Sequence, residues 1–196
     1  MLLDSIHELV RLAHIIAVVL MSAPLYNLIV VGERVRFGKA PLAVDRYFEN
    51  IIRGNSTRCY VFQLTAMATG IVLVLTEGLP FTYIFTNWVL FTKAALLLTL
   101  MGLLSVVHFR IQPSIDRLIS RIEGDSIPPD VAKNLLPLRT FRKRLAATCL
   151  LLVLTIIILA VQIETPFPAY LTVLLLALAA AFSWRVYKVA VPYGWI

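Results

Sequence analysis

Two ionisable side chains stand inside apolar runs that are long enough to cross a lipid bilayer. His14 lies near the middle of the run 9–31, and Lys93 lies near the start of the run 88–108. An ionisable group in that setting is costly without a partner, so it marks a candidate functional site. An imidazole can ligate haem iron or another metal ion, and an ammonium group can pair with a haem propionate. His14 and Lys93 are therefore the first candidates for chemistry.

His14 belongs to a stripe of side chains that advance by three or four residues and so share one helix face. The stripe consists of His7, Arg11, His14, Val18, Met21 and Leu25. Polar groups on its outer half make it a poor lipid face, so we expect it to point into a bundle, a partner or a cofactor. His14 and Lys93 should lie at one level, about 10 Å below the outer helix ends. His7 and Arg11 would border the same site or act as interfacial anchors.

Each candidate also has a simpler explanation, and the sequence leaves both open. His14 could hydrogen-bond to a neighbouring helix, and Lys93 could extend to the lipid headgroups. Met67 and Met101 lie in mid-span and could ligate haem iron or copper, although methionine is more often core filler. His108 lies about 22 Å further along its helix than Lys93, so a haem held between His14 and His108 is disfavoured.

The elements that position these residues should be membrane-spanning helices. Hydrophobic residues make up 60% of the 196-residue chain and charged residues 15%, with a mean hydropathy of +0.86, whereas soluble domains carry about 25% charged residues. The apolar content falls into runs of transmembrane length. We predict an all-α, polytopic helical bundle in a single membrane domain, residues 1–196. Its five spans are 9–31, 59–76, 88–108, 145–163 and 169–187.

The charge distribution predicts the topology. Sixteen of the 18 Lys and Arg residues fall between the first and second spans, between the third and fourth, or at the C-terminal end. The positive-inside rule places these segments in the cytoplasm, with the N-terminus outside and the C-terminus inside. The net charge of +7 then reflects topology and anionic lipids on the cytoplasmic side, and it argues against a nucleic-acid partner.

Two amphipathic helices are expected at the cytoplasmic interface, the first ending at Gly54 and the second at Gly124. Their apolar faces consist of Val44, Phe48, Ile51 and Ile52, and of Ile115, Leu118, Ile119 and Ile122. The opposite face of the first helix carries charged side chains, namely Asp45, Arg46, Glu49 and Arg53. Pro137 is expected to precede the helix that becomes the fourth span.

Two cysteines, Cys59 and Cys149, fall at the cytoplasmic ends of the second and fourth spans, where thiols stay reduced. They lack CxxC spacing and are most simply buried apolar residues, and two thiols alone would leave a metal ion under-liganded. No nucleotide-binding loop, catalytic triad or zinc motif is present in the sequence. Whether the chain is an enzyme stays open; if it is one, we expect an oxidoreductase that acts through bound haem.

Two parts of the chain resemble a known family. Residues 12–19 (LAHIIAVV) with 23–26 (APLY) resemble the first span of the bacterial membrane-bound protoporphyrinogen oxidase family and of the related copper-resistance D membrane proteins. Residues 88–97 (WVLFTKAALL) resemble a later span of that family. The resemblance implies a small helical bundle in the bacterial inner membrane with b-type haem near the first-span histidine. His14 would be the iron ligand and Lys93 a pocket residue.

We therefore expect an integral membrane haem b protein that transfers electrons as a subunit of a larger redox complex or as a homo-oligomer. His14 would be an axial ligand, with Lys93 beside a propionate. One alternative is a non-catalytic accessory subunit whose polar stripe packs against a partner complex. Another is copper handling through His14, Met67 and Met101. A third is protoporphyrinogen oxidase-like chemistry, against which Phe91 weighs, because that family has a histidine at this place.

Overall fold

Helices account for all regular structure in the described part of the chain. The structure is a computed structural model and describes residues 2–33, 41–125 and 127–188. In chain order the elements are α1 (Leu2–Glu33), α2 (Leu42–Thr76), α3 (Tyr83–Thr86), α4 (Trp88–Val106), the π-helical segment η2 (Val107–Ile111), α5 (Gln112–Ser120), α6 (Pro129–Glu164) and α7 (Ala169–Lys188). Five helical stretches are long and apolar enough to cross a membrane. The all-α class is confirmed, and each predicted span coincides with a helical stretch of sufficient length and hydropathy to cross a membrane.

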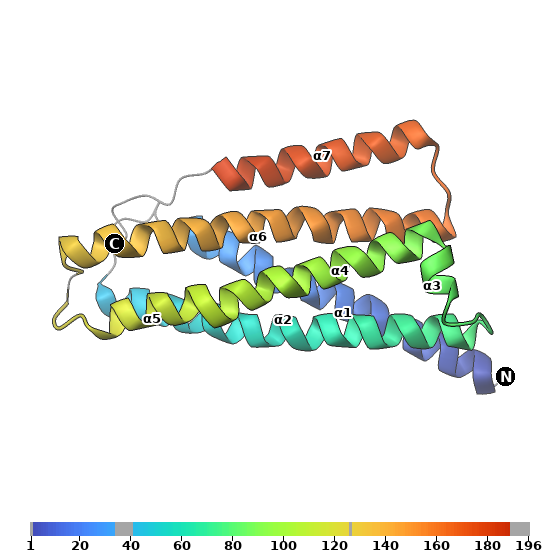
Figure 1. Ribbon diagram of the computed structural model, residues 1–196, viewed down its shortest axis with the longest axis horizontal. Coiled ribbons are helices and arrows are strands. Elements are labelled where there is room, and N and C mark those ends of the chain that lie inside the picture. The colour runs from blue at the N-terminus through green and yellow to red at the C-terminus, as the bar shows by residue number, and fades with distance from the viewer. Residues whose placement is uncertain (1, 34–40, 126, 189–196) are drawn as a thin grey trace.

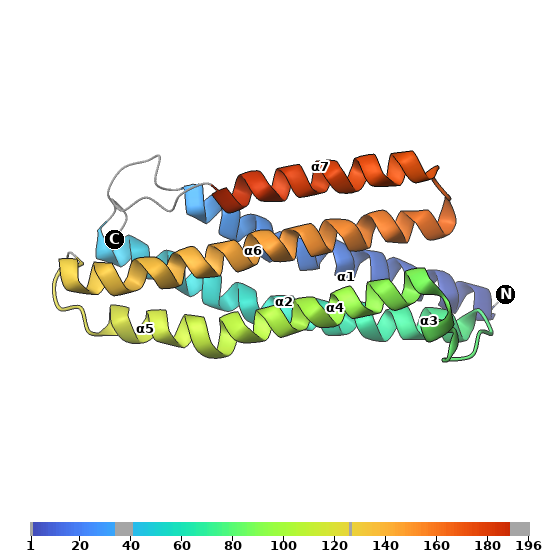
Figure 2. The ribbon, with the colours of Figure 1, turned by 45° about the horizontal axis from the view of Figure 1, so that its top comes forward.

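Four of the long helices form a bundle (Figure 1). α1 packs against α2 and α6, and α4 packs against the same two helices. Consecutive long helices run in opposite directions along the bundle. α7 lies outside these four helices, along α6 (Figure 2). Side chains from α1, α2, α4 and α6 can therefore meet in one interior.

The outside of the bundle is apolar. Large hydrophobic side chains are exposed on each of the five spans, among them Leu9, Val72, Leu98, Val161 and Val173. Water-soluble monomers rarely expose contiguous apolar surface on this scale, whereas lipid covers it without penalty. The exposed side chains support the assignment of a multi-pass membrane protein.

α2 runs unbroken for 35 residues from Leu42 to Thr76, so the prediction that a separate helix ends at Gly54 is wrong. A glycine inside a helix costs only about 1 kcal/mol relative to alanine. The side chains on either side of it, Ile52 and Asn55, are buried in the bundle and hold the helix in place. The first expected interfacial stretch is therefore the beginning of α2.

α6 is also longer than its apolar part. It has 36 residues and begins at Pro129, so Pro137 lies inside the helix rather than before it, contrary to prediction. Leu135 and Arg139, on either side of this proline, are buried against other helices, which compensates for the hydrogen bond that proline removes. We call the end of the bundle where these polar extensions meet the basic end, formed by residues 42–58, 107–125 and 127–144.

At the basic end, the two acidic side chains of the expected charged face of α2 point inward, opposite to expectation, whereas Arg46 and Arg53 of the same face stay exposed. Asp45 and Glu49 are 1% and 2% exposed, whereas Val44, on the expected apolar face, is 39% exposed. The reason is that Arg139 and Arg142 of α6 stand opposite the two carboxylates and pair with them. Two guanidinium groups balance two carboxylates inside the bundle, so this face does not need water.

Pro113 accounts for the π-helical segment between α4 and α5. Proline lacks an N–H group, and its ring clashes with the carbonyl four residues earlier, so the wider turn of η2 absorbs the mismatch. The second expected amphipathic stretch is helical as α5 but ends at Ser120, before Gly124, and its Ile115 and Ile119 pack with Leu135 of α6. The chain then turns through Gly124, whose φ of 107° favours glycine.

Candidate functional site

α1 packs against α2 through the polar stripe that the sequence indicates. His7 Nδ1 lies 2.9 Å from Thr76 Oγ1, and His14 Nδ1 lies 2.9 Å from Thr69 Oγ1. Further along the stripe, Met21 is fully buried. The prediction that this face of the first span points into the bundle is confirmed.

The hydrogen bonds of Thr69 determine which ring nitrogen of His14 carries a proton. Thr69 Oγ1 donates its single proton to the carbonyl oxygen of Thr65 at 2.6 Å, so toward the imidazole it can only accept. His14 Nδ1 therefore donates, and Nε2 of the neutral ring keeps its lone pair. Metal-ligating histidines have this arrangement, in which one nitrogen donates to a fixed acceptor and the other is left for the metal.

Gly70 leaves the space that the His14 ring fills, since a Cβ atom at residue 70 would lie 3.3 Å from His14 Cε1. Gly70→Val is therefore expected to displace the imidazole and to destabilise the protein by about 1–3 kcal/mol through overpacking. Thermal unfolding in detergent measures the loss, and nitrogen NMR of the ring reports the changed hydrogen bond. Gly102→Val is the matched control, because a Cβ there meets nothing within 4 Å. Equal stability of the two variants would contradict the expected confinement of the ring.

The structure brings Lys93 to the same site. Lys93 lies on α4, is half-buried, and is close enough to His14 for an electrostatic interaction between the two side chains. Arg11, one turn before His14, lies 3.9 Å from Glu8 in an exposed ion pair. The two central candidates are therefore together, with Arg11 and His7 nearer the end of α1.

The other candidates lie elsewhere in the bundle. Met67 and Met101 are half-buried and stand outside the core cluster that contains Met21. The ring of His108 packs edge-on against Tyr60, with centroids 5.7 Å apart, in the segment η2. Within residues 2–33, 41–125 and 127–188, no three His, Cys, Asp or Glu side chains gather as a metal site.

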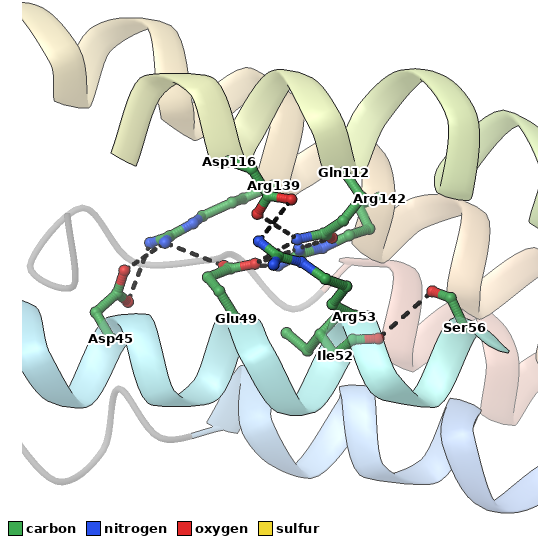
Figure 3. Close-up of polar contacts among 9 residues, drawn as sticks. All are labelled: Asp45, Glu49, Ile52, Arg53, Ser56, Gln112, Asp116, Arg139 and Arg142. Atoms are coloured by element: carbon green, nitrogen blue, oxygen red, sulfur yellow. Dashed lines mark hydrogen bonds and ion pairs between the residues drawn. The ribbon is translucent and has the colours of Figure 1, made fainter. Parts of the chain in front are cut away.

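A set of buried charged side chains, of which the sequence indicated the acidic members as part of a polar helix face, lies at the basic end. Figure 3 shows this ion-pair cluster, which consists of Asp45, Glu49, Gln112, Arg139 and Arg142. Arg139 donates to Asp45 Oδ1 at 3.2 Å and lies 3.0 Å from Glu49 Oε1. Arg142 donates to both Glu49 oxygens, at 2.6 and 3.0 Å, and to Gln112 Oε1 at 2.7 Å.

The charge state of Glu49 follows from these contacts. Burial alone would raise the pKa of its carboxyl group, but Arg142, Arg139 and the Gln112 amide together lower this pKa to about 2. The cluster therefore stays ionised at neutral pH and joins α2, α5 and α6. The signal in the sequence was the spacing, since two acids four residues apart match two arginines three residues apart on another helix.

Between His14 and the ion-pair cluster, the bundle holds a cavity of about 60 Å³. Side chains of α1, α2, α4 and α6 line it, and most of them are apolar. The polar residues in its lining are Asn55, Ser56, Gln63 and Arg142, and the sulfur-containing ones are Met21, Cys59 and Cys149. The two cysteines are buried and free, as expected.

Comparison with known proteins finds no matching family model, no matching curated protein and no matching solved structure. A function for this chain must therefore be inferred from the contacts of its own residues.

Proposed function

We propose that this chain is a haem b-binding protein of the bacterial inner membrane and that it transfers electrons as a subunit of a membrane redox complex. The observation that carries the proposal is the hydrogen bond from His14 Nδ1 to Thr69, which leaves Nε2 as a neutral nitrogen donor. Histidine nitrogen is a common axial ligand of haem iron. Bound haem would supply one-electron chemistry, while the protein supplies ligation and orientation.

The surroundings of His14 fit the remaining needs of such a site. Lys93 offers a positive charge for a haem propionate. Gly70 lets the imidazole lie close against α2, where Thr69 fixes its orientation. His7 and Arg11 would border the site toward the end of α1. The proposal follows the resemblance at His14 and Lys93 and departs from the oxidase family at Phe91, where that family has a histidine.

The position of His14 supports a role in an assembly. The ring is half-buried, and the neighbouring Ile15 and Ile16 are exposed. A group held by Nε2 would therefore have one side against this chain and the other against lipid or protein. We propose that a different membrane subunit, or a second copy of this chain, covers that side.

The charge distribution supports the proposed orientation. The basic end carries most of the Lys and Arg residues, so the positive-inside rule places it in the cytoplasm next to anionic lipids. The N-terminus is then outside, and the His14 site lies in the outer half of the membrane.

The test is a reduced-minus-oxidised absorption spectrum of the full chain, purified in mild detergent from cells that are supplied with haem. A Soret band and an α band are expected, and His14→Ala is expected to lose both. His108→Ala should keep them, because His108 lies in η2, beyond the far end of α4. A colourless wild-type protein, or bands that persist in His14→Ala, would refute haem ligation by His14.

The paired histidine–threonine hydrogen bonds favour a second candidate, a non-catalytic accessory subunit. In that case His7 and His14 serve to hold α1 against α2 through Thr76 and Thr69. Purification from native membranes would then give a colourless, metal-free chain in fixed ratio with other membrane proteins. Thr69→Val would weaken the helix pair without any spectral change.

A further inference from the structure

The cavity in the middle of the bundle is lined by three sulfur-containing residues from three helices. Met21 comes from α1, Cys59 from α2 and Cys149 from α6, and all three belong to one buried core cluster. The two thiols are near enough to each other for an electrostatic interaction. Cys59 Sγ also lies 4.0 Å from the carbonyl oxygen of Met21. Side chains that are far apart in the sequence thus converge on one small space.

Gln63 gives an independent indication that the cavity takes a ligand. It lines the cavity, and it is only 2% exposed. Its Nε2 donates to Cys59 Sγ at 3.4 Å, while its Oε1 has no hydrogen-bond partner in the described structure. A buried polar atom without a partner is rare and calls for an explanation, such as a bound ion. An amide donor beside a sulfur atom also stabilises a thiolate.

The sulfur-containing side chains that line the cavity favour a soft metal ion. Thiolate and thioether sulfur favour Cu(I) over hard cations such as magnesium and calcium, which need oxygen ligands. A structural zinc ion takes four Cys, His or carboxylate ligands. No His, Asp or Glu stands among the described residues that line the cavity, so only the two cysteines could serve zinc.

We propose that Met21, Cys59 and Cys149 form an internal binding site for one soft monovalent metal ion of the Cu(I) class. Two S–H bonds break, two metal–sulfur bonds form in their place, and two protons leave. The Met21 thioether adds a third bond without losing a proton, and the oxidation state of the metal does not change. The site then carries one net negative charge, and Arg142 is among the residues that line the cavity.

This site is separate from the proposed haem site. His14 does not line the cavity, and it bonds to Thr69, which is six residues beyond Gln63 on α2. The proposal also differs from copper handling by His14, Met67 and Met101, because none of these three residues borders the cavity.

The experiment titrates the reduced, full-length protein in detergent, under argon, with Cu(I) held by a chromogenic chelator. We expect one Cu(I) per chain, and a native mass that equals the apo mass plus one copper minus two protons. X-ray absorption should show a first shell of sulfur, to which the Gln63 amide oxygen is the one lighter atom that can be added. Loss of a ligand should cost more than loss of its hydrogen-bond partner, so Cys59→Ala and Cys149→Ala should weaken binding by more than about 100-fold. Gln63→Leu should weaken it by about 10-fold.

Matched controls keep the result interpretable. Met67→Leu, Met101→Leu and His14→Ala should bind Cu(I) like the wild type, whereas Met21→Leu should bind it more weakly. Circular dichroism and size-exclusion chromatography check that each variant is folded. Absence of bound Cu(I) in the wild type, unchanged affinity in a variant that combines Cys59→Ala and Cys149→Ala, or a first shell made mainly of nitrogen or oxygen would each overturn the proposal. The wild-type mass and absorption data test it even where a variant fails to fold.

Discussion

Glu49→Gln is expected to destabilise the protein by about 3–5 kcal/mol, the usual effect of removing one partner from a buried ion pair. The substitution keeps the shape of the side chain but removes the negative charge that faces Arg139 and Arg142. Both arginines are almost fully buried, so water cannot replace the lost carboxylate. The measurement is the free energy of unfolding in mixed micelles, followed by tryptophan fluorescence.

Arg53→Gln is the matched control for this result. Arg53 lies one turn after Glu49 on α2, and its pair with Asp116 spans 2.8 Å, but the two side chains are 53% and 27% exposed. Exposed pairs contribute less than about 1 kcal/mol. If Glu49→Gln were no more destabilising than Arg53→Gln, the ion-pair cluster would not hold the basic end together.

Lowering the pH is expected to remove the stabilisation that ionised Glu49 provides, within a defined pH window. The pKa of Glu49 falls from 4.5 to about 2 on folding, so the folded protein resists protonation more than the unfolded chain does. The stabilisation is therefore present above pH 4.5 and is lost as the pH falls toward 2. A pKa difference of this size corresponds to about 3 kcal/mol. Unfolding free energies measured across this window should fall accordingly.

Comparing the wild type with Glu49→Gln separates the titration of the Glu49 carboxyl group from that of the other acidic side chains. The variant has no group to protonate at residue 49, so its stability should fall less steeply than that of the wild type. The two curves should converge near pH 2. A constant gap between wild type and variant across the window would show that Glu49 does not titrate in the expected range.

The spans and the inward stripe could be predicted because each depends on local sequence. A run of about 20 apolar residues identifies a membrane span whatever the rest of the chain does. The three- and four-residue spacing of His7, His14 and Met21 likewise defines one helix face. The hydrogen bonds to Thr69 and Thr76 could not be predicted, because they depend on how α1 is placed along α2.

The ion-pair cluster was missed for a physical reason. Charged side chains of an amphipathic helix normally face water, so Asp45 and Glu49 indicated a solvated surface. Their partners lie far away in the sequence, 94 residues in the case of Asp45 and Arg139. The cavity of Cys59 and Cys149 was missed in the same way, since nothing local in the sequence brings two distant thiols together.

Because α2 and α6 continue unbroken past their apolar spans, a change in the tilt of these spans is transmitted to the basic end. Residues 42–58 of α2 extend about 25 Å beyond the span, and the ion-pair cluster ties them to α6. A change of about 10° in the tilt of these spans would therefore move the tip of the basic end by roughly 4 Å. Small rearrangements of the spans within the bilayer would thus produce larger displacements at the ends of the paired α2 and α6 extensions.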